Sequence, residues 1–169
     1  MYGYVKVGSA VPKLRVADCV YNKEEILKLV EAAAAKQVRV LSFPELSVTG
    51  YTCADLFFQA PLLHAAEQAI QEIAEATEAL NIFLLIGAPI AVDNQMFNCA
   101  VALYKGKLLG IVPKTHIPNY SEFYEERWFA SADDLLTEEI TYAGQNVPIG
   151  ADLIFAAADF PALKIGVEI

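Results

Sequence analysis

The chain has 169 residues and a formal net charge of −9, with 56% hydrophobic and 20% charged residues. This length suits one domain with its own core, and the composition is typical of a globular chain. The acidic balance without a visible basic patch excludes nucleic-acid binding as the expected function. The longest apolar run, 82–92, contains Gly87 and Pro89 and is too short to span a bilayer, so we expect no membrane partner.

The cysteines and histidines indicate no metal site. Cys19, Cys53 and Cys99 are too few and too scattered for a disulfide framework or a C-x-x-C metal motif, and His64 lies far from His116. The N-terminal segment has no basic region followed by an apolar run, as a signal peptide would. We therefore expect reduced thiols, no metal and a cytoplasmic location.

The first part of the chain predicts a strand–helix–strand unit. Strands are expected at 5–10 and 38–43, with a helix at 23–36 between them. Asn22 is the predicted N-cap of that helix, and Glu25 completes a capping box. A unit of this kind favours parallel pairing of its two strands.

The rest of the chain predicts one more helix and several strands. The helix spans 61–80, with apolar residues at steps of three and four from Leu63. Turns are expected at 93–94 and at 105–106, the second as a tight hairpin. The segment 113–134 is predicted to be polar and aromatic, and irregular sequence is expected from there through 148. Further strands are expected at 82–86, 97–104, 107–112, 152–157 and 164–169. Ala-rich helices and apolar strands favour an α/β class with a sheet buried on both faces.

Two apolar strands are each followed by a proline and a charged residue. The pairs are Pro44-Glu45 and Pro113-Lys114. Because ligands gather at the carboxyl ends of strands in α/β sheets, we expect Glu45 and Lys114 to face a common pocket at the tips of adjacent strands. A carboxylate and an ammonium placed there can serve as a base and an oxyanion stabiliser. Spacing alone leaves open an ordinary ion pair at the base of a loop.

Longer motifs surround both charged residues. Segment 43–51, FPELSVTGY, closely resembles the F-P-E-L-x-x-T-G-Y segment of the nitrilase (carbon-nitrogen hydrolase) superfamily. Asp55-Leu56-Phe57 is similar to the continuation found in the NAD synthetase branch of that superfamily. Segment 113–129, which includes Pro118-Asn119-Tyr120, is similar to the lysine segment of the same branch. The resemblance covers essentially all 169 residues.

The resemblance implies a role for five residues. Glu45 matches the general base that takes a proton from a cysteine thiol, and Lys114 matches the lysine that stabilises the oxyanion. Glu125 matches a second glutamate, which orients Lys114 and the substrate. Tyr51 and Tyr120 match aromatic positions that shape the glutamine pocket and the ammonia exit.

The resemblance also implies a cysteine nucleophile directly after a strand like 164–169. We therefore expect that cysteine just after Ile169 and none in this chain. Cys19, Cys53 and Cys99 do not follow a matching strand end, and Cys99 has the context of a small buried residue. Residues 1–169 are thus expected to form the N-terminal part of one glutaminase domain, with no second domain and no activity alone.

The fold that the resemblance implies is an α-β-β-α sandwich, of which this chain supplies the first part. The implied function is hydrolysis of the glutamine amide, which supplies ammonia for ATP-dependent synthesis of NAD from nicotinic acid adenine dinucleotide. We expect no cofactor in this domain, and ATP and Mg²⁺ in the absent synthetase domain. Expected partners are glutamine, that synthetase domain and further copies of the chain, because uncovered sheet surfaces favour self-association. Two alternatives stay open: a stand-alone amidase, carbamoylase or nitrilase, and a non-catalytic fragment or pseudoenzyme.

Overall fold

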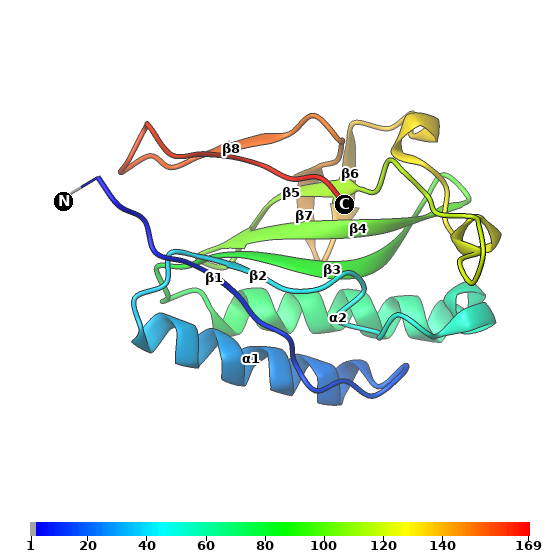
Figure 1. The fold of residues 1–169 in the computed structure, drawn as a ribbon, viewed down its shortest axis with the longest axis horizontal. Coiled ribbons are helices and arrows are strands. Elements are labelled where there is room, and N and C mark those ends of the chain that lie inside the picture. Colours follow the sequence, from blue (N-terminus) through cyan, green and yellow to red (C-terminus); the bar gives the residue numbers. More distant parts are fainter. Residues whose placement is uncertain (1–2) are drawn as a thin grey trace.

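A five-stranded mixed sheet forms the centre of the molecule. The computed structural model describes residues 3–169 (Figure 1). The sheet has the order β1-β2-β3-β4-β5. Neighbours β1, β2 and β3 pair in parallel, whereas β3, β4 and β5 pair antiparallel. The strands are β1 (Val7–Ser9), β2 (Val40–Ser42), β3 (Phe83–Val92), β4 (Gln95–Tyr104) and β5 (Lys107–Pro113).

Two helices, α1 (Cys19–Ala35) and α2 (Ala60–Ala76), cover one face of this sheet (Figure 1). Their apolar sides form much of the core, and Ile26 and Ile70 are fully buried. Placing apolar side chains at helical spacing against an apolar sheet removes both surfaces from water, which stabilises the layer. The predicted α/β class and the parallel pairing of the first two strands are confirmed.

The start of α1 differs from the prediction. The N-cap is Asp18, whose side chain accepts a hydrogen bond from the Tyr21 amide at 3.0 Å. Asn22, the predicted cap, lies inside the helix and is fully buried. Its Nδ2 donates to the carbonyls of Arg15 and Val48, so it ties the helix to the loop after β2. Both side chains are good caps, and the tertiary contact to Val48 decides between them.

The hairpin turns follow the expected chemistry. Asp93-Asn94 joins β3 to β4 and Lys105-Gly106 joins β4 to β5, and all four residues have positive φ. Such turns match the right-handed twist of paired strands. A third hairpin, β6 (Glu139–Tyr142) and β7 (Gln145–Pro148), turns at Ala143-Gly144 in the same way. This hairpin lies in the segment predicted to be irregular, so that prediction is wrong there.

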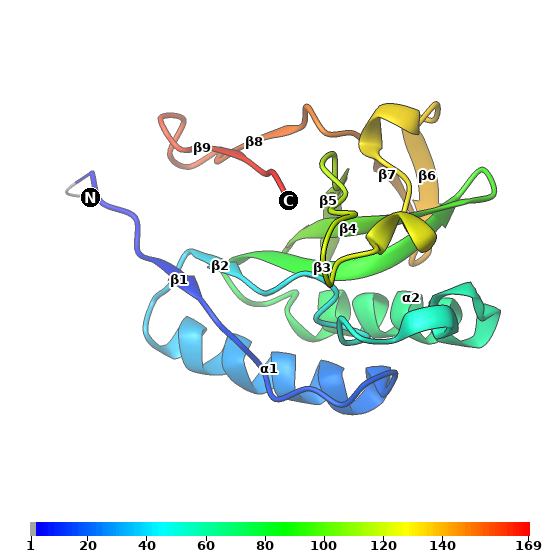
Figure 2. The same ribbon diagram turned by 45° about the vertical axis from the view of Figure 1, so that its right-hand side comes forward.

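The last hairpin lies on the sheet face opposite the helices (Figures 1 and 2). It consists of β8 (Ile154–Ala156) and β9 (Lys164–Gly166), which pair antiparallel. The ring of Phe155 packs against that of Phe83 in β3, with 5.4 Å between the ring centroids. The central sheet is therefore covered on both faces.

The unequal lengths of β2 and β3 create the space for a site. Ser42 at the end of β2 pairs with Leu85, but β3 continues to Val92. The chain that leaves β2 can therefore pass over the second half of β3. Three short helical turns complete the fold: η1 (Ala54–Phe58), η2 (Glu125–Arg127) and η3 (Ala132–Asp134). Among the helices of residues 3–169, none combines the length and the apolar character that crossing a membrane requires.

Candidate active site

Glu45 is placed by a tight crossing over β3. After β2 the backbone of residues 44–46 lies directly on Gly87, where a Cβ atom would stand 2.3 Å from the Leu46 nitrogen and 2.5 Å from the Pro44 oxygen. Only a glycine tolerates this approach. Leu46 adopts a left-handed conformation with a φ of 52°, which is uncommon outside glycine and clusters at functional sites. The Val48 amide then bonds the Gly87 carbonyl at 3.1 Å and anchors the crossing.

Lys114 meets Glu45 in a direct ion pair. Lys114 follows the last residue of β5, and its Nζ donates to Oε2 of Glu45 at 2.8 Å. The common location predicted for the two side chains is therefore found, but their strands are not adjacent, because β3 and β4 lie between β2 and β5. Both strands point the same way, since two antiparallel steps separate β5 from β3. Their carboxyl ends therefore lie at one end of the sheet.

Glu125 is the second carboxylate on Lys114. It opens η2 and is 3% exposed, and its Oε2 lies 3.1 Å from the Lys114 Nζ. The Tyr51 hydroxyl donates to Oε1 of the same carboxylate. The structure thus gathers four of the predicted residues from the two motif segments, 43–51 and 113–129: Glu45, Tyr51, Lys114 and Glu125.

The electrostatics of this cluster keep the lysine charged. Burial by itself lowers the pKa of Lys114, but the hydrogen bonds and charges of Glu45 and Glu125 outweigh it, so the pKa is raised above the usual lysine range. Burial, followed by the hydrogen bond to Glu125, raises the pKa of Tyr51 and keeps its hydroxyl protonated as a donor. A fixed ammonium and a fixed donor network are the groups that stabilise charge developing on a substrate oxygen.

Asn98 belongs to the cluster and was missed by sequence reasoning. It lies in β4, is fully buried, and its Nδ2 donates to Oε2 of Glu45 at 2.7 Å. The Asn98 carbonyl also accepts from the Lys114 amide at 2.8 Å. The available signal was a single amide between apolar neighbours in a strand, because buried polar groups need a partner.

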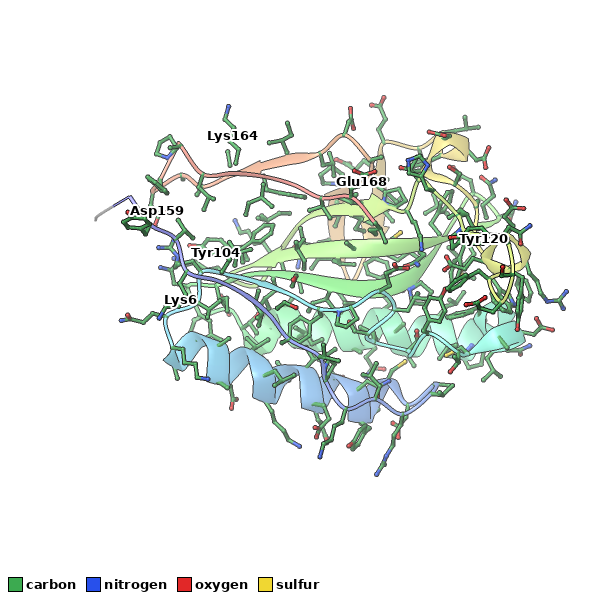
Figure 3. All side chains as sticks on the ribbon, in the orientation of Figure 1. Lys6, Tyr104, Tyr120, Asp159, Lys164 and Glu168 are labelled. Atoms are coloured by element: carbon green, nitrogen blue, oxygen red, sulfur yellow. The ribbon has the colours of Figure 1, made fainter. Side chains whose placement is uncertain are left out.

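Tyr120 does not join the cluster. It is 68% exposed, and its ring contacts that of Phe123 with 5.9 Å between the centroids. Figure 3 shows it on the loop beyond β5, at the far right of the view. The loop that carries Tyr120 turns the ring outward, and its role in shaping the glutamine pocket stays a prediction.

A cavity of about 370 Å³ opens beside Glu45. Its walls are residues 42–45, parts of β3 and β4, and the segment Val167–Ile169. The end of the strand that the resemblance places before the nucleophile thus shares a cavity with the predicted base. The Glu45 side chain is 37% exposed, so it can reach a group in that space.

The three thiols are buried, unlike a reactive cysteine. Cys19 and Cys53 are each 2% exposed and Cys99 is 0% exposed. Burial, with a smaller effect of Cys53, raises the pKa of Cys19 to about 11. Burial also raises the pKa of Cys53 and of Cys99 above the usual thiol range. Cys99 borders the cavity near Glu45, but a thiol with a raised pKa is a poor nucleophile.

The described histidines and acidic residues form no metal centre. No three His, Cys, Asp or Glu side chains within residues 3–169 are grouped so that they could hold a metal ion. His116 is strongly exposed, and its Nε2 lies 3.9 Å from Oε1 of Glu168.

Comparisons with known proteins identify relatives of this chain. The chain is 36% identical over 167 residues to the glutamine-dependent NAD(+) synthetase of Mycobacterium leprae, covering 99% of this chain and 24% of that protein. It is 30% identical over 165 residues to the enzyme of the same name from Rattus norvegicus, covering 87% and 23% of the two chains. The chain thus spans about a quarter of the length of the curated relatives that it matches.

Solved structures share the fold. A crystal structure of a glutamine-dependent NAD(+) synthetase from Cytophaga hutchinsonii superposes with a TM-score of 0.86 at 28% identity, over 96% of this chain and 27% of that one. An amidase from Nesterenkonia sp. gives a TM-score of 0.60 at 19% identity, over 82% of this chain and 52% of that one, which shows the fold alone. The expected partial nitrilase-type fold is therefore confirmed. The family model for carbon-nitrogen hydrolases matches residues 6–169, and the chain belongs to that family.

Proposed function

We propose that this chain is the glutaminase part of a glutamine-dependent NAD synthetase. The single observation that carries the proposal is the contact of Lys114 Nζ with Glu45 at 2.8 Å and with the buried Glu125 at 3.1 Å, beside the cavity that Ile169 borders. The relatives are glutamine-dependent NAD(+) synthetases, which supports glutamine as the substrate and NAD synthesis as the use of the ammonia.

The proposed reaction begins with a cysteine thiol at the position directly after Ile169. Glu45 takes the thiol proton, and the thiolate attacks the amide carbon of glutamine. Negative charge develops on the amide oxygen, and the ammonium of Lys114 stabilises it. Glu125 holds that ammonium in place, and Tyr51 holds Glu125.

The tetrahedral intermediate then collapses. Glu45 returns its proton to the nitrogen, the carbon–nitrogen bond breaks, and ammonia leaves an acyl-thioester behind. Glu45 next takes a proton from water, and the hydroxide attacks the thioester. The carbon–sulfur bond breaks, Glu45 returns its proton to the leaving thiolate, and glutamate and the free thiol are released. The ammonia is proposed to pass to a synthetase domain that uses ATP and Mg²⁺ to amidate nicotinic acid adenine dinucleotide.

Residues 1–169 alone are proposed to be inactive. Glu45 has no thiol among its described hydrogen-bond partners, and all three thiols of the chain are buried with raised pKa values. Glutamine turnover by the 169-residue polypeptide that disappears in Cys53→Ser or Cys99→Ser would overturn this part of the proposal.

The test is glutamine hydrolysis by the full-length gene product, measured as ammonia and glutamate released. Glu45→Gln removes the base but keeps the shape, so turnover is expected to fall about 1,000-fold. Glu122→Gln is the matched control, because Glu122 is exposed near the cluster without contacting it. Unchanged turnover in Glu45→Gln would refute the proposed role. Preference for simple amides, carbamoyl compounds or nitriles over glutamine would favour a stand-alone hydrolase instead.

A further inference from the structure

Asn98 is a polar residue in a strand that otherwise buries apolar side chains. Its neighbours Phe97 and Cys99 are both fully buried, as is Asn98 itself. Desolvating an amide is costly unless it makes hydrogen bonds, so a buried asparagine in such a strand needs a specific partner. Asn98 pairs with Pro89 in the part of β3 that extends past β2, two residues beyond Gly87, where the chain carrying Glu45 crosses.

Asn98 contacts both residues of the ion pair, Glu45 through its side-chain amide and the Lys114 backbone through its main-chain carbonyl. Its Nδ2 donates to Oε2 of Glu45 at 2.7 Å, and its main-chain oxygen accepts from the Lys114 amide at 2.8 Å. The Lys114 Nζ donates to the same Oε2 at 2.8 Å. One residue of β4 therefore fixes the side chain of Glu45 and the backbone of Lys114 at once.

These donors converge on a single carboxylate oxygen. Oε2 of Glu45 accepts from Asn98 and from Lys114, and the described residues supply no donor to Oε1. A carboxylate with one oxygen held by two donors takes up a proton on the other oxygen, because an added proton on the first would displace a donor. The arrangement leaves Oε1 as the oxygen that faces an incoming proton.

The oxygen of the Asn98 side-chain amide makes no compensating hydrogen bond. Oδ1 of Asn98 is buried and has no hydrogen-bond partner in the described structure. Turning the amide over would aim this acceptor at the Glu45 carboxylate and lose the Nδ2 bond. An unpartnered buried acceptor is destabilising, and such departures from good packing occur where function requires them.

We propose that Asn98 is a positioning residue that holds Oε2 of Glu45 and so selects Oε1 as the basic oxygen. That Oε1 acts as the base in catalysis rests on the proposed function. That Asn98 holds the Glu45 carboxylate in place rests only on the hydrogen bond between them. Asn98 touches no reacting atom in this scheme. It acts through the direction in which Glu45 presents its free oxygen.

The test uses the full-length protein with Asn98→Asp, Asn98→Leu and Asn98→Ser. The first two keep the approximate size but remove the donor. We expect kcat for glutamine to fall about 100-fold, with KM changed less than about threefold, because the effect concerns the chemical step and not substrate binding. Val101→Ala is the matched control, since Val101 is fully buried in the same strand and does not contact Glu45. It should lower Tm and leave kcat unchanged.

A crystal structure of Asn98→Leu provides a readout that does not depend on turnover. The Glu45 carboxylate is expected to rotate so that Oε2 no longer lies within hydrogen-bond distance of the Lys114 Nζ. An unmoved Glu45, or a kcat loss that follows the Tm loss across all three variants, would overturn the positioning role. Absent glutamine turnover by the wild-type protein would instead overturn the proposed function, and the variant structure would still decide the role of Asn98.

Discussion

The backbone of Gly87 lies against that of Glu45 so closely that a Cβ atom on Gly87 would stand 2.7 Å from the Glu45 carbonyl carbon. The neighbouring atoms are backbone, which cannot rotate away as a side chain can. The placement of the candidate base therefore depends on a residue that has no side chain.

Gly87→Ala is expected to push residues 44–46 off β3. Overpacking of this kind costs about 1–3 kcal/mol of stability, and a displacement of Glu45 by an ångström can reduce turnover about 100-fold. Urea unfolding and a glutaminase assay measure the two effects. Gly166→Ala is the control, because a Cβ there would meet nothing within 4 Å. Normal activity in Gly87→Ala would show that the crossing adapts without moving the base.

Lys114→Met should destabilise the fold as well as abolish turnover. It removes the counter-charge of Glu125, which is 3% exposed, and a buried charge left unpaired costs about 3 kcal/mol. The double variant Lys114→Met with Glu125→Gln should recover most of that stability but none of the activity. Chemical denaturation of the single and double variants measures the coupling. Equal stability of the single and double variants would mean that the Glu125 carboxylate does not need the Lys114 ammonium as its counter-charge.

The two tyrosines predicted beside the substrate should behave differently. Tyr51→Phe removes the hydroxyl that donates to Glu125, and the loss of one hydrogen bond to a carboxylate is expected to cost about 1 kcal/mol, with a lower kcat. Tyr120→Phe is the matched change on an exposed ring and should alter neither quantity. Thermal unfolding measures the stability of the two variants, and steady-state kinetics measures their kcat. A larger effect at Tyr120 would contradict the arrangement described above.

Stability is expected to fall between about pH 9 and pH 11 because of Cys19. Its pKa rises from 9.0 to about 11 on folding, chiefly through burial. Below pH 9 both states keep the thiol proton, so the stability is fully present there. Above pH 9 the unfolded state loses the proton first, and the folded state is penalised by about 2–3 kcal/mol by pH 11.

Urea unfolding at pH 8, 9.5 and 10.5 measures this loss. Cys19→Ala is the control that should make the decline shallower over this range, while the raised pKa values of Cys53 and Cys99 maintain the rest of it. The raised pKa of Lys114 adds a further decline only above its ordinary value of 10.5, as the folded state keeps a proton that the unfolded state releases. A slope that is the same in wild type and Cys19→Ala would assign the alkaline loss to other groups.

Local signals in the sequence were enough to predict much of this fold. The turns at 93–94 and 105–106 were predicted because Asp-Asn and Lys-Gly between apolar strands are typical of hairpins. The turn at Ala143-Gly144 uses the same geometry, but it lies between strands of only four residues in a polar segment, where alternation is too short to detect.

The identities of most site residues could be predicted from the sequence, but the strand order that brings them together could not. Glu45 and Lys114 were recognised from their motifs, whereas the parallel pairing of β2 with β3, which sets two strands between β2 and β5, joins segments that are remote in sequence. Asn98 carries no motif and is recognised only once its Nδ2 is seen at 2.7 Å from Glu45. Tyr120 had the expected sequence context, but the direction of its side chain is set by a loop that no local pattern specifies.

The early end of β2 constrains chain length more than amino-acid identity. Ser42 closes β2 opposite Leu85, and only two residues, Phe43 and Pro44, separate it from Glu45. Since alternate positions of an extended segment face opposite sides, adding or deleting one residue there would turn the carboxylate away from the ammonium even if every other side chain were retained. Substitutions between positions 42 and 45 should therefore be tolerated better than insertions or deletions.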